Sequence, residues 1–149
     1  MNHAWLGVDP GKTGAVALLG DDGSVLVEDF SDVYGMAFTL REWMAMCNIV
    51  AAGVEKVASR PGQGVVSTFN FGMNVGTWHG LLAANAIALH TPTPRTWQQK
   101  YLSKADGPDT KAASLAVARR LYPTADLRFK KHHNRADALL IATWVRDTV

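Results

Sequence analysis

The first thirty residues constrain the fold most strongly, because three apolar segments alternate there with two turn sequences. The apolar segments are residues 5–8, 15–19 and 24–30. The intervening residues 9–14 (DPGKTG) and 20–23 (GDDG) are rich in Asp, Gly and Pro, which favour tight turns. Strands joined by turns this short pair antiparallel. The sequence therefore predicts that the fold opens with a three-strand antiparallel meander.

Helices and strands alternate in the rest of the chain. Met36, Leu40, Trp43 and Cys47 recur at spacings of three and four, which predicts a helix over residues 36–50. The remaining pattern predicts strands at 54–58 and 88–91, a structural break at 60–64, and helices at 65–87, 95–102, 110–122 and 134–147. We therefore expect an α/β fold with one mixed sheet, helices on both of its faces, and a single domain over residues 1–149.

Composition limits the class of protein further. Hydrophobic residues make up 48% and charged residues 19% of the 149 residues, which is typical of a globular domain. The single cysteine, Cys47, excludes an internal disulfide and suits a reducing compartment. No apolar run approaches the roughly 20 residues of a membrane span, and the N-terminus does not resemble an export signal. We expect a cytoplasmic protein with no membrane partner, in a bacterial cell or a phage-infected host.

Three glycines, Gly72, Gly76 and Gly80, lie at four-residue spacing in the predicted helix over residues 65–87. Each interior glycine costs a helix about 1 kcal/mol relative to alanine. This cost indicates that one face of the helix needs close backbone approach. The neighbour is either the sheet, which we favour, or a second subunit.

Three acidic residues occupy places that otherwise prefer apolar residues. Asp9 ends the first apolar segment, Glu55 lies between Val54 and Val57, and Asp137 begins a helical stripe. Burying an unpaired carboxylate is costly, so each acid needs a reason to be there. A shared Mg²⁺ or Mn²⁺ is one such reason, because these ions prefer oxygen ligands.

Each acid also has a purely structural interpretation. Asp9 precedes Pro-Gly, as in a type I turn. Glu55 could point outward from an edge strand, and Asp137 could form a capping box with Asn134. His133 and Asn134, four and three residues before Asp137, could each supply a fourth metal ligand, although a histidine at a basic helix start is also compatible with a solvated or DNA-facing position.

Positive charge is concentrated late in the chain. Residues 95–131 contain nine lysines and arginines against three aspartates, although the net charge of the whole chain is only +2. Such asymmetry is typical of a surface that binds a polyanion, and it is equally compatible with a solvated face.

Several motifs together resemble the RuvC family of junction resolvases, particularly its phage-encoded single-domain members. The matching segments run through almost the whole chain: residues 7–11 (GVDPG) with Thr13-Gly14, 54–57 (VEKV), 61–64 (PGQG), 93–97 (TPRTW), 109–111 (DTK) and 135–142 (RADALLIA).

The resemblance implies an RNase H-like fold, a homodimer, and a divalent-metal-dependent endonuclease that makes paired symmetric nicks in four-way (Holliday) DNA junctions. It places metal ligands and catalytic residues at Asp9, Glu55, Asp137 and His133, with Asn134 as a substitute for His133, around two Mg²⁺ ions that Mn²⁺ could replace. Many relatives carry an acid where this chain has His133 or Asn134. The expected DNA-binding residues are Arg95, Lys100, Lys104, Lys111, Lys130, Lys131 and Arg135.

Other functions remain open at this point. The turn over residues 9–14 also resembles the phosphate-binding turn of actin-like and sugar-kinase ATPases, but those enzymes need two such domains, so we expect no nucleotide cofactor. Within the same fold, a flap nuclease or a nuclease for RNA–DNA hybrids is an alternative. A junction-binding protein that does not cleave is a third possibility.

Overall fold

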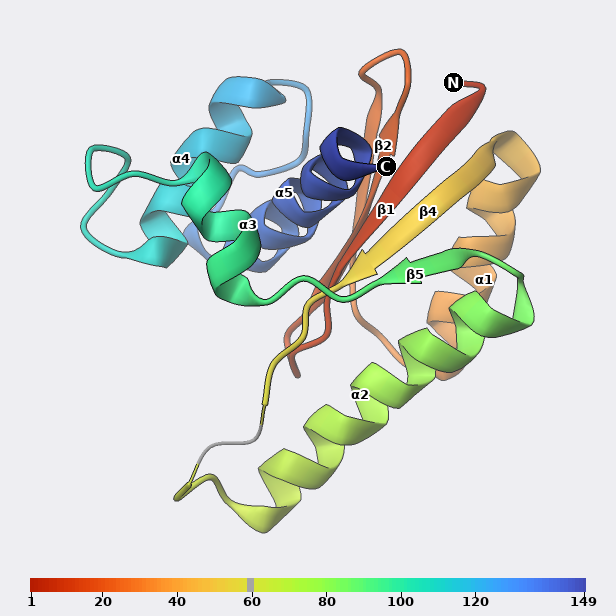
Figure 1. Ribbon diagram of the computed structural model, residues 1–149, viewed down its shortest axis with the longest axis horizontal. Helices are drawn as coiled ribbons and strands as arrows, with labels where there is room; N and C mark the ends of the chain where they lie inside the picture. Colours follow the sequence, from red (N-terminus) through yellow and green to blue (C-terminus); the bar gives the residue numbers. More distant parts are fainter. Residues whose placement is uncertain (59–60) are drawn as a thin grey trace.

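The computed structural model describes residues 1–58 and 61–149. Its five strands form one sheet in the order β3-β2-β1-β4-β5. The strands β1 (His3–Asp9), β2 (Ala15–Gly20) and β3 (Val25–Asp29) are antiparallel, whereas β4 (Asn48–Val54) runs parallel to β1 and β5 (Ala88–His90) parallel to β4. The predicted meander and mixed sheet are therefore confirmed (Figure 1).

Helices cover both faces of this sheet, as predicted. The helices α1 (Val33–Met46) and α2 (Val65–Ala84) contribute side chains to one apolar core. The other core is shared by α3 (Pro94–Tyr101), α4 (Thr110–Leu121) and α5 (His133–Thr148). Figure 1 shows α5 crossing the sheet on the side opposite to α2.

Short polar residues begin three of the helices. The side chains of Asp32, Thr93 and Asp109 accept hydrogen bonds from backbone amides in the first turns of α1, α3 and α4. These bonds satisfy amides that have no partner within the helix. The helix α5 follows directly from a short 3₁₀ helix, η1 (Lys130–His132), and has no side-chain cap. The predicted capping box of Asn134 and Asp137 is therefore wrong.

The boundaries of β4 differ from the prediction. The strand spans Asn48–Val54, so that Glu55 is the first residue after it and α1 ends earlier than predicted. Most of β4 is buried in the middle of the sheet, and a strand covered on both faces is apolar throughout. Its sequence therefore lacks the alternation that marks a strand and reads as a continuation of the helix. In the predicted break at 60–64, Arg60 lies outside the described residues, and Gly62 has a positive φ of 83° that suits a turn.

The helix α5 lies very close to the two central strands because both carry a glycine beneath it. A Cβ atom on Gly7 of β1 would lie 2.0 Å from the carbonyl oxygen of Ala138 and 2.3 Å from the amide nitrogen of Ala142. A Cβ atom on Gly53 of β4 would lie 2.7 Å from Val145 and 2.8 Å from Ile141. The absence of these two side chains therefore sets how near α5 comes to the sheet.

The glycines of α2 do not face the sheet. An added Cβ atom on Gly72, Gly76 or Gly80 would meet no atom within 4 Å in the described structure. The interpretation that these glycines allow α2 to approach the sheet is therefore wrong. No described helix combines the length and apolarity that crossing a membrane requires.

Candidate active site

Asp9 and Glu55 lie side by side at the ends of neighbouring parallel strands. Val8 of β1 is in register with Val54 of β4, and the amide of Glu55 donates a hydrogen bond to the carbonyl of Val8 at 3.1 Å. Asp9 lies two residues after Gly7, and Glu55 two residues after Gly53. Side chains two apart on a strand share a face, so both acids emerge toward α5.

Asp137 reaches the same place from α5. It immediately precedes Ala138, whose carbonyl lies against Gly7. One of its carboxylate oxygens, Oδ1, is buried, and no described residue hydrogen-bonds to it. The other two acids have partners: Oδ1 of Asp9 accepts from the amide of Gly11 at 3.2 Å, and Oε1 of Glu55 accepts from Trp97 at 2.8 Å. Asp9 therefore serves the turn that was its structural alternative, whereas Glu55 does not point outward from an edge strand.

All three carboxyl groups are easier to protonate than free acids, mainly because they are buried. Burial raises the pKa of Asp9. Burial, together with the charge of Asp9, raises the pKa of Glu55 to about 7, although the hydrogen bond from Trp97 opposes the shift. Burial and the charges of Asp9 and Glu55 raise the pKa of Asp137 to about 8, although Ser114 and Lys111 oppose the shift. The fold therefore brings the three acids near enough for their charges to interact, in surroundings that favour bound protons or cations.

We expect the metal-free protein to lose stability between about pH 6.5 and pH 8. The native state keeps protons on Glu55 and Asp137 that the unfolded chain has already released. The free energy of unfolding therefore falls as the pH rises, by up to about 1.4 kcal/mol per pH unit for each proton. Below about pH 6.5 the buried His132 and the half-buried His133, whose pKa values are lowered, act in the opposite direction.

Urea unfolding in the presence of a chelator, at several pH values across this window, measures how the free energy of unfolding changes with pH. The Asp137→Asn variant should make the fall in stability with pH shallower, because the amide does not titrate and only Glu55 still releases a proton in this window. A wild-type stability that stays constant over the window would contradict the shared site.

The oxygen atoms of the three carboxylates suit a hard divalent cation such as Mg²⁺, although the side chains are not arranged as a ready metal site. Within residues 1–58 and 61–149, no three acidic, histidine or cysteine side chains converge closely enough to hold an ion as they stand. Oδ1 of Asp137 is nevertheless buried without a hydrogen-bond partner among the described residues, and the negative charges of Asp9 and Glu55 act on this carboxylate, so a cation bound here would be stabilised. Carboxylate oxygens are the ligands that Mg²⁺ and Mn²⁺ prefer.

His133 and Asn134, the alternative fourth ligands, point to different neighbours. Burial, with help from Lys111 of α4, lowers the pKa of His133, which leaves the imidazole neutral and able to bind a metal. Its Nδ1 is buried and has no partner in the described part of the chain. Asn134 instead donates hydrogen bonds to the carbonyl and hydroxyl oxygens of Thr13, which fasten the β1–β2 turn to α5.

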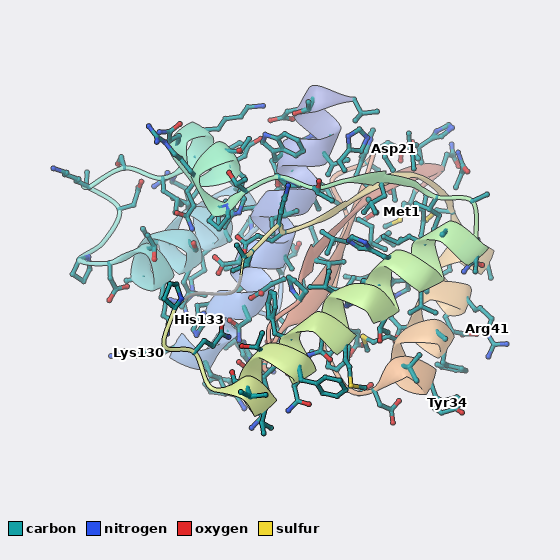
Figure 2. All side chains as sticks on the ribbon, turned by 60° about the horizontal axis from the view of Figure 1, so that its bottom comes forward. Met1, Asp21, Tyr34, Arg41, Lys130 and His133 are labelled. Atoms are coloured by element: carbon teal, nitrogen blue, oxygen red, sulfur yellow. The ribbon has the colours of Figure 1, made fainter. Side chains whose placement is uncertain are left out.

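Several of the predicted DNA-binding residues surround the start of α5. Lys111, Lys130 and Lys131 line a cavity of about 610 Å³ together with His133. Figure 2 shows Lys130 and His133 at the same end of the molecule. Lys12, which the sequence analysis missed, lines a neighbouring cavity of about 370 Å³ with Lys131. The signal for Lys12 was its place in the turn that follows Asp9.

The other predicted DNA-binding residues lie elsewhere. Lys104 lines a separate cavity of about 350 Å³ between α3 and α4, and Arg95 is exposed on α3. Lys100 pairs with Asp147 at 3.5 Å.

Arg135 has two acidic partners within the chain. Its guanidinium group contacts the carboxylates of Asp29 at 2.7 Å and Asp126 at 2.8 Å, so its charge is already balanced. Arg135 therefore holds β3 and the segment before η1 against α5, and its contact with DNA remains a prediction.

Trp97 is a further residue of the site that the sequence analysis did not identify as functional. It belongs to α3 and is fully buried, and its indole N–H is the donor to Glu55. Trp97 falls within one of the segments that carry the family resemblance, but nothing in its spacing indicates a contact with Glu55. The two residues are 42 positions apart.

Comparison with known proteins places this geometry in context. No family model matches the chain. The chain is 41% identical over 87 residues, or 56% of its length, to the chloroplastic Holliday junction resolvase MOC1 of Chlamydomonas reinhardtii, and it spans 10% of the length of that protein.

Solved structures of Thermus thermophilus RuvC match nearly the whole chain. RuvC in complex with a Holliday junction substrate has a TM-score of 0.68 at 15% sequence identity, covering 99% of this chain and 97% of that one. A second RuvC structure has a TM-score of 0.59 at 17% identity, covering 93% of this chain and 90% of that one. The chain therefore has the RNase H-like fold of RuvC, as the sequence predicts.

Proposed function

We propose that this chain is a divalent-metal-dependent endonuclease that resolves four-way DNA junctions by paired, symmetric nicks. The observation that supports the proposal is that Asp9 at the end of β1, Glu55 just after β4 and Asp137 of α5 lie near enough for their charges to affect one another. The sequence likeness to a protein named as a Holliday junction resolvase supports it, as does the structural likeness to RuvC in complex with a Holliday junction substrate.

Asp9, Glu55 and Asp137 would hold the metal, with His133 as the fourth ligand and Asn134 as its substitute. We propose two Mg²⁺ ions per site, with Mn²⁺ able to replace them. When bound, such ions supply water activation and charge stabilisation for the hydrolysis of a phosphodiester. The residues of the chain position the ions: Gly11 holds one oxygen of Asp9, and Trp97 holds one oxygen of Glu55.

The basic residues around the start of α5 would bind the phosphates of the DNA strand that enters the site. Lys111, Lys130 and Lys131 line the cavity next to His133, and Lys12 in the β1–β2 turn lines the neighbouring cavity with Lys131. Arg95, Lys100 and Lys104 would contact a more distant arm. Contacts of this kind give affinity that falls steeply with salt and carries little sequence information, so the shape of the junction would determine selectivity.

A homodimer is part of the proposal, and the outer face of α2 is its proposed interface. Phe69, Gly72, Met73 and Gly76 lie on one side of this helix, at spacings of three and four. Phe69 is 66% and Met73 56% exposed, and no described atom lies near the two glycines on that side. A twofold symmetric dimer through this face would let two copies of the site address two strands of a junction.

We expect Phe69→Asp to convert the dimer to a monomer without unfolding it, because a charge on this face opposes apolar contact while the side chain is already solvent-exposed. The matched control is Leu121→Asp, an exposed apolar residue of α4 on the opposite face of the sheet. Sedimentation measures the mass of each variant. A Phe69→Asp protein that remains dimeric would contradict this interface.

Cleavage of three substrates tests the function. A labelled four-way junction, a plain duplex and an RNA–DNA hybrid of the same sequence are incubated with the protein in Mg²⁺ or Mn²⁺. We expect paired nicks in the junction alone. Preferential cleavage of the hybrid would indicate a ribonuclease, and junction binding without nicking in either metal would indicate a binding protein.

A further inference from the structure

Glu55 accepts a hydrogen bond from a residue of α3, a helix that lies well after it in the sequence. The indole N–H of Trp97 donates to Oε1 of Glu55 at 2.8 Å, and the Trp97 side chain is 0% exposed. Trp97 packs in the apolar core that α3 shares with α4 and α5. A fully buried ring in a close-packed core has little freedom, so the direction of its N–H bond is fixed.

A second contact fixes the approach of α3 to the end of β4. The amide of Lys56, the residue after Glu55, donates to the carbonyl of Pro92 at 2.8 Å. Pro92 lies just before α3, whose first turn is capped by Thr93 and contains Pro94. The backbone on both sides of the Trp97–Glu55 bond is therefore held, and the hydrogen bond is not an incidental contact of two mobile side chains.

The geometry of this bond leaves part of the carboxylate available. An indole has a single N–H, so Trp97 engages one oxygen of Glu55, and a carboxylate can accept through both of its oxygens. A hydrogen bond to a charged acceptor stabilises the charged form and restricts its rotation. Groups that orient a metal ligand in this way typically change metal affinity about 10- to 100-fold when they are removed.

We propose that Trp97 is a positioning residue that holds the Glu55 carboxylate in one orientation, with its second oxygen directed to a divalent cation. This inference rests on the proposed metal site. Trp97 does not touch the ions or the DNA, and it acts only through Glu55.

The chain offers a matched control for this role. Trp78 of α2 is 1% exposed and packs in the other apolar core, and its indole N–H has no hydrogen-bond partner within the described ranges. Trp97→Phe and Trp78→Phe therefore remove similar volumes of buried aromatic side chain, but only Trp97→Phe removes the donor to Glu55.

The first experiment titrates Mn²⁺ alone into the full-length protein by calorimetry, without DNA. We expect Trp97→Phe to bind Mn²⁺ about 10- to 100-fold more weakly than the wild type and Trp78→Phe to bind it equally well. In a Glu55→Gln background, Trp97→Phe should cause no further loss. Wild-type affinity in Trp97→Phe, or equal weakening in both tryptophan variants, would overturn the proposal.

Indole N–H resonances in the NMR spectrum provide a readout that does not require a folded Trp97 variant. In the wild-type protein, saturating Mg²⁺ should shift the Trp97 indole resonance and leave the Trp78 resonance in place. A Trp97 resonance that stays unchanged while Mg²⁺ binds would overturn the proposal. A wild type that binds both metals but cleaves no DNA would refute the proposed function alone, whereas a wild type that binds neither metal would refute both.

Discussion

Asp9→Asn is expected to slow junction cleavage by a factor on the order of 10³ or more, at least as much as losing one well-placed catalytic hydrogen-bond donor costs. The affinity for the junction should change little. The substitution keeps the size of the side chain and the oxygen that accepts from the Gly11 amide, so the β1–β2 turn is preserved. It removes the negative charge that a divalent cation requires. The phosphate contacts lie on other residues, and for this reason binding should survive.

The Asp9→Asn variant should be more stable than the wild type although it is less active. Burial already raises the pKa of Asp9, so its charged form is disfavoured in the folded protein, and a neutral amide relieves that cost. The matched control is Asp32→Asn, which also removes one negative charge but lies at the start of α1, where asparagine is an equally good cap. Single-turnover cleavage and a binding titration separate the two effects. Equal loss of cleavage and binding in Asp9→Asn, or loss of cleavage in Asp32→Asn, would count against the site.

Gly7→Ala is expected to destabilise the fold by about 3 kcal/mol or more, at the upper end of overpacking costs. The new methyl group would lie 2.0 Å from the carbonyl oxygen of Ala138 and 2.3 Å from the amide nitrogen of Ala142. Both atoms belong to the backbone of α5, so no side-chain rotation relieves the clash and the helix itself must move. A domain is stable by only about 5–15 kcal/mol, so this is a large part of the total.

Gly64→Ala provides the comparison for Gly7→Ala. Gly64 has a φ of −61°, and an added Cβ atom would meet nothing within 4 Å in the described structure. Its replacement should change the free energy of unfolding by no more than about 1 kcal/mol. Urea denaturation of both variants measures the difference. A Gly7→Ala protein as stable as the wild type would show that α5 can move away from β1 at little cost.

The sequence predicts the elements with strong local signals. The turns at residues 9–14 and 20–23 are marked by Asp, Gly and Pro, so the meander and the place of Asp9 at its first turn follow from local chemistry. The sequence marks Asp9, Glu55 and Asp137 because each acid interrupts an otherwise apolar element. Their charges do affect one another in the structure, but a shared metal site remains a prediction.

Long-range packing could not be predicted in the same way. The strand β4 is buried on both faces and so lacks alternation, which displaced its predicted limits and placed Glu55 inside it. Asp29, one partner of Arg135, is 106 residues away from it, and Glu55 is 42 residues away from Trp97, and no spacing rule reports such contacts. A row of glycines on a helix indicates that another backbone comes close, but it does not identify the neighbour. For this reason the sequence analysis favoured the sheet as the neighbour of the α2 glycines, and the structure shows that it is not.

The two glycines beneath α5 have a consequence for how this protein can change. Gly7 and Gly53 each precede an acid of the site by two residues, and the helix that rests on them carries the third acid. The spacing between helix and sheet is therefore also the spacing between Asp137 and its two partners. Substitutions of buried residues such as Ile141 or Val145 would therefore change the distance between Asp137 and the other two acids. Variants selected only for higher thermal stability could lose the proposed activity in this way.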